Sequence, residues 1–375
     1  MPPDRPPRVL LTTAGFGDGH NSAARNLDRA LHGTAECRIV DPCAEGAPLL
    51  NHALRLGYRL VTTHAPSVWH RIYRSVENRD FSRQQVPFMR LAERALAAQV
   101  EAVDPDVVAS TYPLYPYFLD RYFKQGGRRR TVLTIVTDSI EINAAWCHAP
   151  SDYWLVTDPE TRRGLVDKGL PEGRVIDTGF PVDPLFNDLQ PVPADDRADP
   201  FRVLFFPTAK RPVVRRIARA VLSHSGARTE LTIVLGRNLR RLYRRAREIK
   251  KAYPGRVRLL GWTRKVPELL CRHHLCIGKA GGATVHEALA ARCPMLVHHL
   301  VPGQEEGNLR LLRHIGGGNL ADSEEALAAA LRDLLADEAE GWRRQKRNLA
   351  RHARPNAAIV AARLILQHAR DPVPA

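Results

Sequence analysis

Short apolar runs alternate with helical patterns along the whole chain, and this order predicts parallel sheets that are covered by helices. The first run, Val9–Leu11, is followed by a glycine turn and by a helix expected from about Ser22 to Leu31. Further strands of this first series are expected at residues 38–40, 107–110, 132–136, 153–156 and 175–177. A second series is expected at residues 203–206, 231–235, 257–260, 275–278 and 295–297. The pattern therefore predicts an α/β protein with two doubly wound, Rossmann-like domains.

The two series are separated by Gln190–Pro200, a segment rich in proline and aspartate that is typical of an exposed connector. We expect a first domain of residues 1–190, a linker of residues 191–200 and a second domain of residues 201–350. Two such domains face each other across a cleft, and ligands of doubly wound sheets bind beyond the carboxyl ends of the strands. A length of 375 residues suits two domains that each bury a core.

The composition, with 44% apolar and 26% charged residues, indicates a globular protein rather than a disordered or fibrous one. The sequence contains no run of about eighteen apolar residues and no recognisable secretion signal, so we expect a cytoplasmic protein. Its six cysteines form no CxxC pair, which favours buried free thiols over a zinc site or a disulfide framework.

The formal net charge of +16 comes from the second half of the chain, where residues 191–375 hold 34 Lys and Arg against 17 Asp and Glu. A dense basic stretch runs from Arg237 to Lys251. Such a stretch suits nucleic acid, an anionic lipid surface or water, and a solvated helix face explains it as simply as a specific partner does.

Two glycine turns each follow a strand and open a helix, as turns that bind phosphate or substrate do. The first, residues 14–20, ends in His20, whose ordinary pKa suits a general base but which equally suits a structural or capping role. The second, residues 279–284, lets a diphosphate approach backbone amides, and Glu287 lies where it can bind a ribose. A capping box formed by Thr284 and Glu287 is the alternative. A third turn, residues 301–308, carries amides and carboxylates that suit sugar hydroxyls or an acidic helix start.

Five segments in this order resemble the monogalactosyldiacylglycerol synthase family, which includes the processive diacylglycerol glucosyltransferases: GFGDGHNSAA, LGRN, LLGW, GKAGGATVHEALAARCPML and VPGQEEGN. The segments VTDSIEINAAW and DTGFPVDPLF also look like family segments. This family is related to the N-acetylglucosaminyltransferase that completes the lipid-linked peptidoglycan precursor. The resemblance covers nearly the whole chain.

The resemblance implies the GT-B architecture, with an acceptor domain, a donor domain and a last segment, residues 351–375, that returns to the first domain. It implies an inverting transfer from a UDP-sugar to diacylglycerol or a related lipid, with no required metal or other cofactor. It further implies that His20 matches the family histidine of the glycine turn. Because the acceptor hydroxyl must lose its proton in such a transfer, His20 is expected to be the base and Asp138 to orient or assist it, although a turn or helix-cap carboxylate is the commoner reason for an aspartate there. Gly17, Gly19 and Tyr112 are expected on the acceptor side. The implied donor-binding residues are Asn238, Trp262, Thr263, Gly281, Gly282, Ala283, Thr284, Glu287, Gln304, Glu305 and Asn308.

The chain departs from the family pattern at two places. The loop after the first strand of the donor domain reads Phe206–Pro212 instead of being rich in glycine, which leaves open whether Lys210 or Arg211 meets phosphate there. Tyr112-Pro113 stands where the family often has histidine before proline, so the acceptor pocket is expected to differ. A polyprenyl-linked or soluble acceptor, and a non-catalytic protein that binds a nucleotide-sugar, remain alternatives, whereas nucleic acid is not an expected partner.

Residues of about 49–100 are expected to contact an anionic membrane surface and to admit the acceptor, at the inner face of the cell membrane. This stretch interleaves arginines with aliphatic and aromatic residues, a mixture that suits the headgroup boundary. A pair of amphipathic helices packed on the acceptor sheet is the alternative. The residues expected to make this contact are Trp69, Arg71, Ile72, Tyr73 and Arg74.

Overall fold

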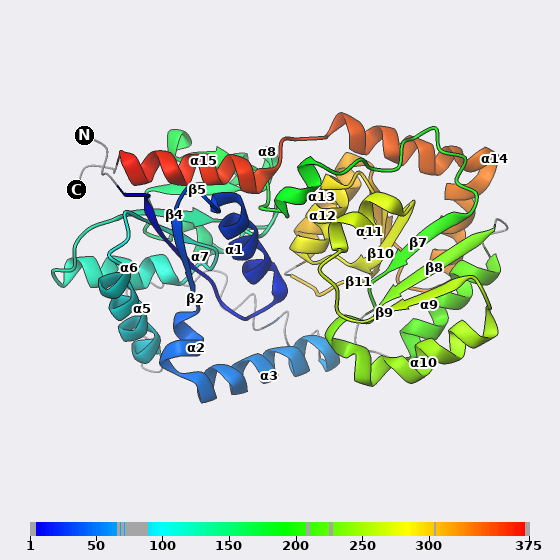
Figure 1. Ribbon diagram of the computed structural model, residues 1–375, viewed down its shortest axis with the longest axis horizontal. Coiled ribbons are helices and arrows are strands. Elements are labelled where there is room, and N and C mark those ends of the chain that lie inside the picture. Colours follow the sequence, from blue (N-terminus) through cyan, green and yellow to red (C-terminus); the bar gives the residue numbers. More distant parts are fainter. Residues whose placement is uncertain are drawn as a thin grey trace. The chain divides into compact units, whose positions relative to one another are not determined.

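The computed structural model describes residues 5–65, 68, 71, 89–207, 211–224, 228–303 and 305–371. It divides into two compact units, which are described here one at a time. The first consists of residues 1–184, 301–307 and 355–375, and the second of residues 185–300 and 308–354. Figure 1 shows helices on the faces of a sheet in each unit.

The first unit is built on a six-stranded parallel sheet in the order β2-β1-β3-β4-β5-β6. Its strands are β1 (Arg8–Thr12), β2 (Glu36–Val40), β3 (Val107–Ser110), β4 (Thr131–Ile135), β5 (Tyr153–Val156) and β6 (Val175–Asp177). Its helices are α1 (Asp18–Leu31), α2 (Pro42–Gly46), α3 (Pro48–His64), α5 (Arg90–Val103), α6 (Tyr115–Lys124), α7 (Ala144–Cys147), α8 (Pro159–Asp167) and α15 (Ala357–Arg370). The last helix packs beside α1, as Figure 1 shows in red and dark blue.

Both faces of this sheet are buried, because successive side chains of a strand point to opposite faces and helices cover each face. Val9 and Leu11 of β1 join a buried cluster with Ala361 and Ile365 of α15. Leu10 joins the opposite cluster, to which α5 and α6 contribute. This two-sided burial explains why the strands read as short continuous apolar runs rather than as alternating ones.

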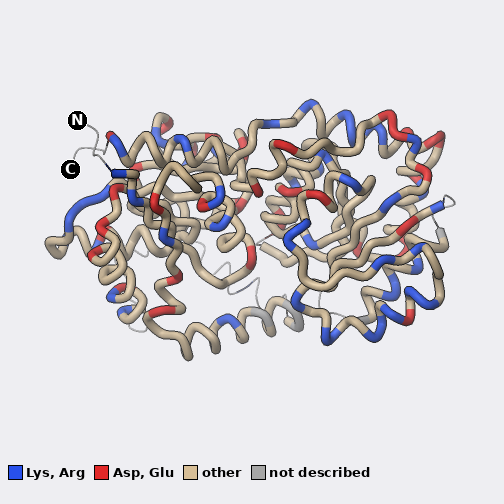
Figure 2. The backbone as a smooth tube through the Cα atoms, in the orientation of Figure 1, with Lys and Arg blue, Asp and Glu red and all other residues tan. Residues whose placement is uncertain are grey.

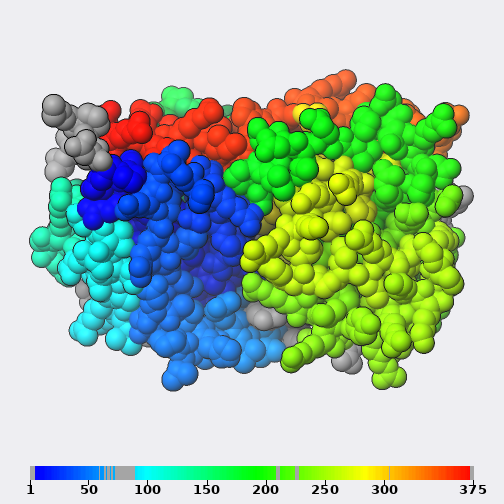
Figure 3. Space-filling model, viewed as in Figure 1, coloured from blue at the N-terminus to red at the C-terminus, as the bar shows by residue number. Residues whose placement is uncertain are grey.

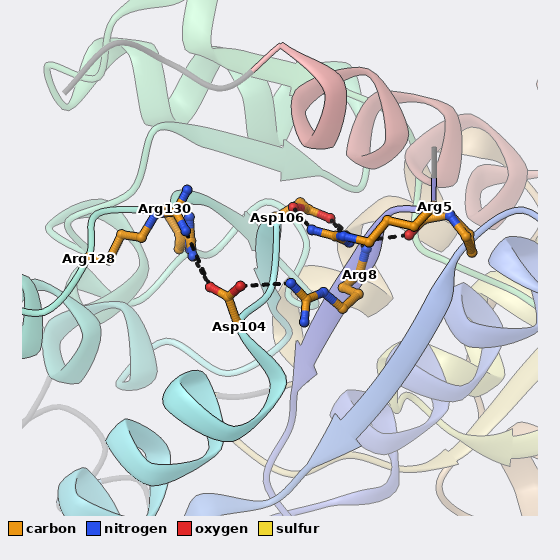
Figure 4. Close-up of polar contacts among 7 residues, drawn as sticks. Arg5, Arg8, Asp104, Asp106, Arg128 and Arg130 are labelled. Carbon is orange, nitrogen blue, oxygen red and sulfur yellow. Dashed lines mark hydrogen bonds and ion pairs between the residues drawn. The ribbon is translucent and has the colours of Figure 1, made fainter. Parts of the chain in front are cut away.

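A network of ion pairs joins the amino ends of β1, β3 and β4, at the edge opposite to the turns singled out above (Figure 4). An oxygen of Asp106 lies 2.8 Å from a nitrogen of Arg5, and an oxygen of Asp104 lies 2.7 Å from a nitrogen of Arg8. Arg130, which precedes β4, also pairs with Asp104. Partial burial works to raise the pKa of Asp104, but Arg130 and Arg8 outweigh it, and the pKa is lowered. These charges link the amino ends of the three strands and lie at the edge opposite to the predicted site residues.

The second unit has a six-stranded parallel sheet in the order β12-β11-β10-β7-β8-β9. Its strands are β7 (Phe201–Phe205), β8 (Thr229–Val234), β9 (Val257–Leu260), β10 (Leu275–Lys279), β11 (Met295–His299) and β12 (Gly318–Leu320). Its helices are α9 (Arg211–His224), α10 (Leu239–Ala252), α11 (Val266–Arg272), α12 (Gly282–Ala290), α13 (Glu306–Ile315, which begins in the first unit) and α14 (Glu324–Arg351). The prediction of two doubly wound parallel sheets is confirmed.

The segment Gln190–Pro200 is not the exposed connector that its composition suggests. Val192 and Ala198 are buried in the core of the second unit, and the Val192 N–H donates to the carbonyl of Cys271 at 2.9 Å. A carboxylate oxygen of Asp196 lies 2.9 Å from a ring nitrogen of the buried His274. Two isolated apolar residues among prolines and aspartates give no periodic signal, so a pattern search overlooks their burial.

Candidate functional site

The carboxyl edge of the first sheet gathers three of the residues that the sequence singled out. The chain leaves β1 toward β2 on one side and later adds β3 on the other, so β1 and β3 flank the topological switch point, where open α/β sheets bind ligands. His20 follows β1, Tyr112 follows β3 and Asp138 follows β4. The rings of His20 and Tyr112 meet edge to face with their centroids 5.3 Å apart.

His20 lies in the first turn of α1, just after the glycine turn. The helix is capped by Gly17, whose φ of 107° is a conformation that glycine adopts far more readily than other residues, so a capping role for His20 is excluded. The Nδ1 atom of His20 lies 3.0 Å from the hydroxyl oxygen of Thr137. Burial lowers the pKa of His20 to about 4, which keeps its imidazole neutral at neutral pH. When Nδ1–H donates to Thr137, Nε2 carries the lone pair that can accept a proton.

Asp138 contacts a different partner from the one expected of a residue that orients a base. Its carboxylate accepts a hydrogen bond from Nε1 of Trp146 at 2.8 Å, and burial raises its pKa to about 6. It does not cap the following helix α7, because Asn143 does so. The hydroxyl that contacts His20 belongs instead to Thr137, which lies in the segment VTDSIEINAAW but is not among the predicted site residues.

The turn that follows β11 belongs to the first unit and packs closely on the segment after β4. A Cβ atom on Gly307 would lie 1.8 Å from the carbonyl oxygen of Ser139, so only glycine fits there. Glu305 is buried, and its Oε2 accepts a hydrogen bond from the Val301 N–H at 3.0 Å. The carboxylate of Glu305 therefore takes part in shaping its own turn.

In the second sheet, β10 and β7 flank the switch point, and α12 begins there directly after β10. Gly281 occupies the N-cap position, and the first backbone bond of the helix runs from the Val285 N–H to the Gly281 carbonyl. The amides of Gly282, Ala283 and Thr284 precede that bond and lie at the positive end of the helix dipole. Because Thr284 is the third residue of the helix rather than its cap, the capping-box alternative is wrong.

Glu287 and Asn308 lie beside this turn. Glu287 is half-buried in the second turn of α12. Burial raises the pKa of the Cys276 thiol, and the nearby charges of Cys293 and Glu287 raise it further. Asn308 is buried and donates from Nδ2 to the Ala280 carbonyl at 3.1 Å. Its Oδ1 has no hydrogen-bond partner within the described part of the chain, which leaves one acceptor at the turn for a ligand donor.

Three further donor candidates, Asn238, Trp262 and Thr263, follow β8 and β9 at the same carboxyl edge. Asn238 stands at the N-cap position of α10, but its side chain makes no capping bond. Trp262 is 58% exposed, with the guanidinium carbon of Arg264 5.6 Å from its ring centroid. At about 4.8 Å per strand, the loop after β8, two strands from β10, starts roughly 10 Å from the α12 turn, and the loop after β9, three strands from β10, starts roughly 14 Å from it.

Several of the predicted residues lie outside the described part of the chain. They are Trp69, Ile72, Tyr73, Arg74, Gln304 and Lys210. The side chain of Arg211 also lies outside it, whereas Arg71 is described as an exposed helical residue. Gly19 lies in the first turn of α1, next to His20.

Comparison with known proteins finds similar sequences along most of the chain. Residues 20–182 match the family model described as monogalactosyldiacylglycerol (MGDG) synthase. The processive diacylglycerol beta-glucosyltransferase of Bacillus thuringiensis is 23% identical over 345 residues, which is 88% of this chain and 86% of that protein. The same enzyme of Bacillus anthracis has the same identity and coverage.

Among solved structures, MurG of Acinetobacter baumannii matches with a TM-score of 0.61 and 16% identity, over 96% of this chain and all of that one. A putative UDP-N-acetylglucosamine 2-epimerase of Listeria monocytogenes also matches with a TM-score of 0.61, at 14% identity, over 96% and 95% of the two chains. These likenesses confirm the GT-B fold, and the resemblance noted in the sequence is confirmed by the family model and the curated relatives. The chain is similar to the monogalactosyldiacylglycerol synthases and the processive diacylglycerol glucosyltransferases, and it has the GT-B fold.

Proposed function

We propose that the protein is an inverting glycosyltransferase that moves a hexose from a UDP-sugar to the hydroxyl of diacylglycerol. The observation that carries the proposal is the His20 imidazole, which burial keeps neutral and which Thr137 contacts through Nδ1. The curated relatives are named for glucosyl transfer to diacylglycerol, and the open start of α12 offers the amides that a nucleotide diphosphate needs.

In this reaction the acceptor oxygen forms a bond to the anomeric carbon as the bond from that carbon to the diphosphate oxygen breaks. The acceptor hydroxyl gives its proton to Nε2 of His20, and the bonding electron pair leaves with UDP. The amides at the start of α12 stabilise the negative charge that develops on the diphosphate. Glu287 would bind the ribose, and Asn308, Glu305 and Gln304 would bind the sugar. The proposal requires no metal or other cofactor.

Helix α3 supports the proposal that residues of about 49–100 dock on a membrane. Leu49, Leu56 and Leu60 lie on one helical face at intervals of seven and four residues, and they are 87%, 52% and 51% exposed. Asn51 and Thr62 on the opposite face are buried. An ordinary surface helix buries its apolar face and exposes its polar face, whereas α3 exposes leucines and buries polar residues. Such an arrangement suits a helix that lies in the headgroup boundary. Figure 3 shows α3 at the surface of the molecule.

The same helix lies next to the glycine turn. The guanidinium group of Arg55, from α3, occupies the space where a side chain on Gly15 would lie. A lipid that reaches α3 would therefore arrive beside the turn that carries His20. No described helix is long and apolar enough to cross a bilayer. We propose a peripheral attachment to the inner face of the cell membrane, with anionic lipid favoured by the arginines of this region.

Release of UDP tests the reaction. The protein is incubated with UDP-glucose, UDP-galactose or UDP-N-acetylglucosamine, with and without dispersed diacylglycerol, and both UDP and glycolipid are measured. We expect UDP release that depends on diacylglycerol and matches the glycolipid formed. UDP release stimulated only by a polyprenyl-linked or soluble acceptor would replace the lipid assignment, and binding of a UDP-sugar without any release would identify a non-catalytic protein.

The membrane contribution of α3 is tested by Leu49→Ser, Leu56→Ser and Leu60→Ser combined. We expect the variant to sediment less with lipid vesicles while keeping its thermal stability, because the three side chains are exposed. A control replaces the exposed Leu185 and Ile39, which lie outside residues 49–100, with Ser. Equal sedimentation of the α3 variant and the unmodified protein would remove α3 from the docking surface.

A further inference from the structure

Helix α10 carries the densest positive charge among the described helices, and Figure 2 shows it as a succession of blue segments. Its fourteen residues include a single acid, Glu248. The basic residues are Arg240, Arg241, Arg244, Arg245, Arg247, Lys250 and Lys251, and all are exposed. None of them belongs to the donor or acceptor residues proposed above.

The charges are arranged in a line rather than scattered. Leu242, Ala246 and Ile249 are buried and fix the inner face of α10. The outermost line, diametrically opposite, consists of Arg240, Arg244, Arg247 and Lys251, spaced by three or four residues so that neighbours lie one turn apart. Glu248 lies to one side of that line, where it pairs with Arg245 at 2.9 Å and with Arg244 at 3.7 Å.

This arrangement is unfavourable for the isolated helix. Cations three or four residues apart on a helix repel one another. The first turn contains no acid and carries Arg240 and Arg241 at the positive end of the helix dipole, where cations are disfavoured. An external surface of negative charge would remove both penalties at once. A helix that violates two local rules on its solvent face is a candidate interaction surface.

Exposed apolar groups border the basic line on one side only. Leu239 is 40% exposed and Tyr243 is 47% exposed. The loop after β9 lies beside them, since a side chain on Gly261 would lie 3.7 Å from Leu239, and the next residue is the exposed Trp262. Phosphates of a nucleic acid would satisfy the arginines but offer nothing to an exposed leucine. The headgroup boundary of an anionic bilayer takes both kinds of group.

We propose that α10 is a docking surface of the second unit for anionic lipid bilayers, in addition to α3 of the first unit. The Arg240–Arg244–Arg247–Lys251 line meets the headgroup phosphates, and Leu239 with Tyr243 enters the boundary region beside them. The proposal is independent of the reaction: an error in the acceptor or the sugar leaves it unchanged. It predicts attachment that falls with added salt, because exposed charges are screened within about 8 Å at physiological ionic strength.

The test replaces Arg240, Arg244, Arg247 and Lys251 with Gln in the full-length protein, and measures co-sedimentation with vesicles that contain about 30% phosphatidylglycerol. Each basic side chain that meets an anionic surface is worth about fivefold in partitioning. We expect a loss of roughly tenfold or more on these vesicles and no change on vesicles of phosphatidylcholine alone. UDP-sugar turnover in detergent should stay within about twofold of the unmodified protein.

A matched control removes the same charge from other exposed positions, by Arg219→Gln, Arg332→Gln, Arg344→Gln and Arg351→Gln. Equal losses in both variants would mean that only bulk charge acts, and would overturn the proposal. An unchanged vesicle affinity of the α10 variant would also overturn it, as would a loss of binding to duplex oligonucleotides with vesicle binding intact. A second variant, Leu239→Ser with Tyr243→Ser, is expected to bind anionic vesicles at low salt but to release them at lower salt than the unmodified protein.

Discussion

At the scale of single residues, His20 differs from the buried His273 in its free ring nitrogen. Among the described residues, His20 has a hydrogen-bond partner at Nδ1 only, whereas both ring nitrogens of His273 are bonded. Burial keeps the ring neutral, and the Thr137 hydroxyl lies 3.0 Å from Nδ1. The neighbouring Asp138 is bound to Trp146, so its charge does not pair directly with the ring. The imidazole is thus positioned by a neutral hydroxyl, and a proton taken from the acceptor would be held by a group with an unusually low pKa in the free protein.

We expect His20→Ala to lower the transfer rate by roughly 10²–10⁴ while donor binding stays nearly intact, because the proton acceptor is lost but the second unit is unchanged. Turnover is measured with saturating UDP-sugar, and donor affinity by calorimetry. His32→Ala, which changes a histidine just beyond the end of the same helix, serves as the control. Full turnover of His20→Ala on the natural acceptor would remove His20 from the mechanism.

For Glu287→Ala we expect weaker binding of the UDP-sugar, by about 1 kcal/mol or about fivefold, if one hydrogen bond to a neutral ribose is lost. Since Gly281 caps α12, a change in affinity cannot be attributed to a lost capping box. Calorimetry with UDP alone and with the UDP-sugar measures the effect. Equal affinities of the folded variant and the unmodified protein would leave Glu287 without a role in donor binding.

The sequence predicted which residues share an edge, because turns that follow parallel strands must meet at the same end of a sheet. His20, Tyr112 and Asp138 come together for that reason. Thr137 was not predicted, because nothing within the segment VTDSIEINAAW distinguishes a threonine at a strand end as the partner of His20. The position of Gly281 as the N-cap of α12 could not be predicted either, because Thr284 and Glu287 have the spacing of a capping box. The capping box is excluded only by the observed start of the helix at Gly282.

At the scale of elements, the contact between Gly307 and the Ser139 carbonyl fixes how the turn after β11 approaches the segment after β4. We expect Gly307→Ala to destabilise the protein by about 1–3 kcal/mol, because its Cβ would overlap a backbone oxygen that cannot move aside freely. Denaturant unfolding measures the change.

Gly164→Ala provides the matched control, since Gly164 lies within α8 and a Cβ there meets nothing within 4 Å. That substitution should raise stability by about 0.5–1 kcal/mol through the helix preference of alanine. A Gly307→Ala variant as stable as the unmodified protein would show that the turn relaxes without cost.

Most strands could be predicted because each contains a short run of apolar residues. β12 (Gly318–Leu320) was not predicted, because its three residues include a glycine and an asparagine and give no apolar signal. The burial of Val192 and Ala198 escaped prediction for a related reason, since it depends on contacts with residues far along the chain. The exposure of the leucines of α3 could not be predicted either, because the sequence does not show which face of the helix packs on the protein.

At the scale of the whole molecule, four histidines have their pKa lowered to about 4 chiefly by burial: His20, His273, His274 and His298. In the unfolded chain a histidine titrates near 6.5. Between these values the unfolded state binds more protons, so stability is lost as the pH falls through 6.5 toward 4, by up to about 1.4 kcal/mol per pH unit for each proton. The pKa of Asp138, raised to about 6, acts in the opposite direction but is one group against four.

We therefore expect the free energy of unfolding to decrease steadily from pH 7 to pH 5, measured by urea titration at several pH values. His273→Gln should make this dependence less steep by up to one proton, since its ring is neutral in the folded state and bonded to Leu269 and Thr232. Stability that is constant or rises over this range would contradict the assignment of these histidines as neutral.

Helix α15 has a consequence for how the protein is made. Its Ala361, Ala362 and Ile365 complete the buried cluster that covers Val9 and Leu11 of the first strand. The ribosome synthesises β1 before the second unit and α15 after it, so the core of the first unit cannot close until the residues of the second unit have been translated. Domain-by-domain folding during synthesis, with the amino-terminal unit first, is the usual order for chains of this size. Here the residues of the second unit are all synthesised before α15. Until α15 is synthesised, the apolar face of the first sheet that it covers, which includes Val9 and Leu11, stays exposed.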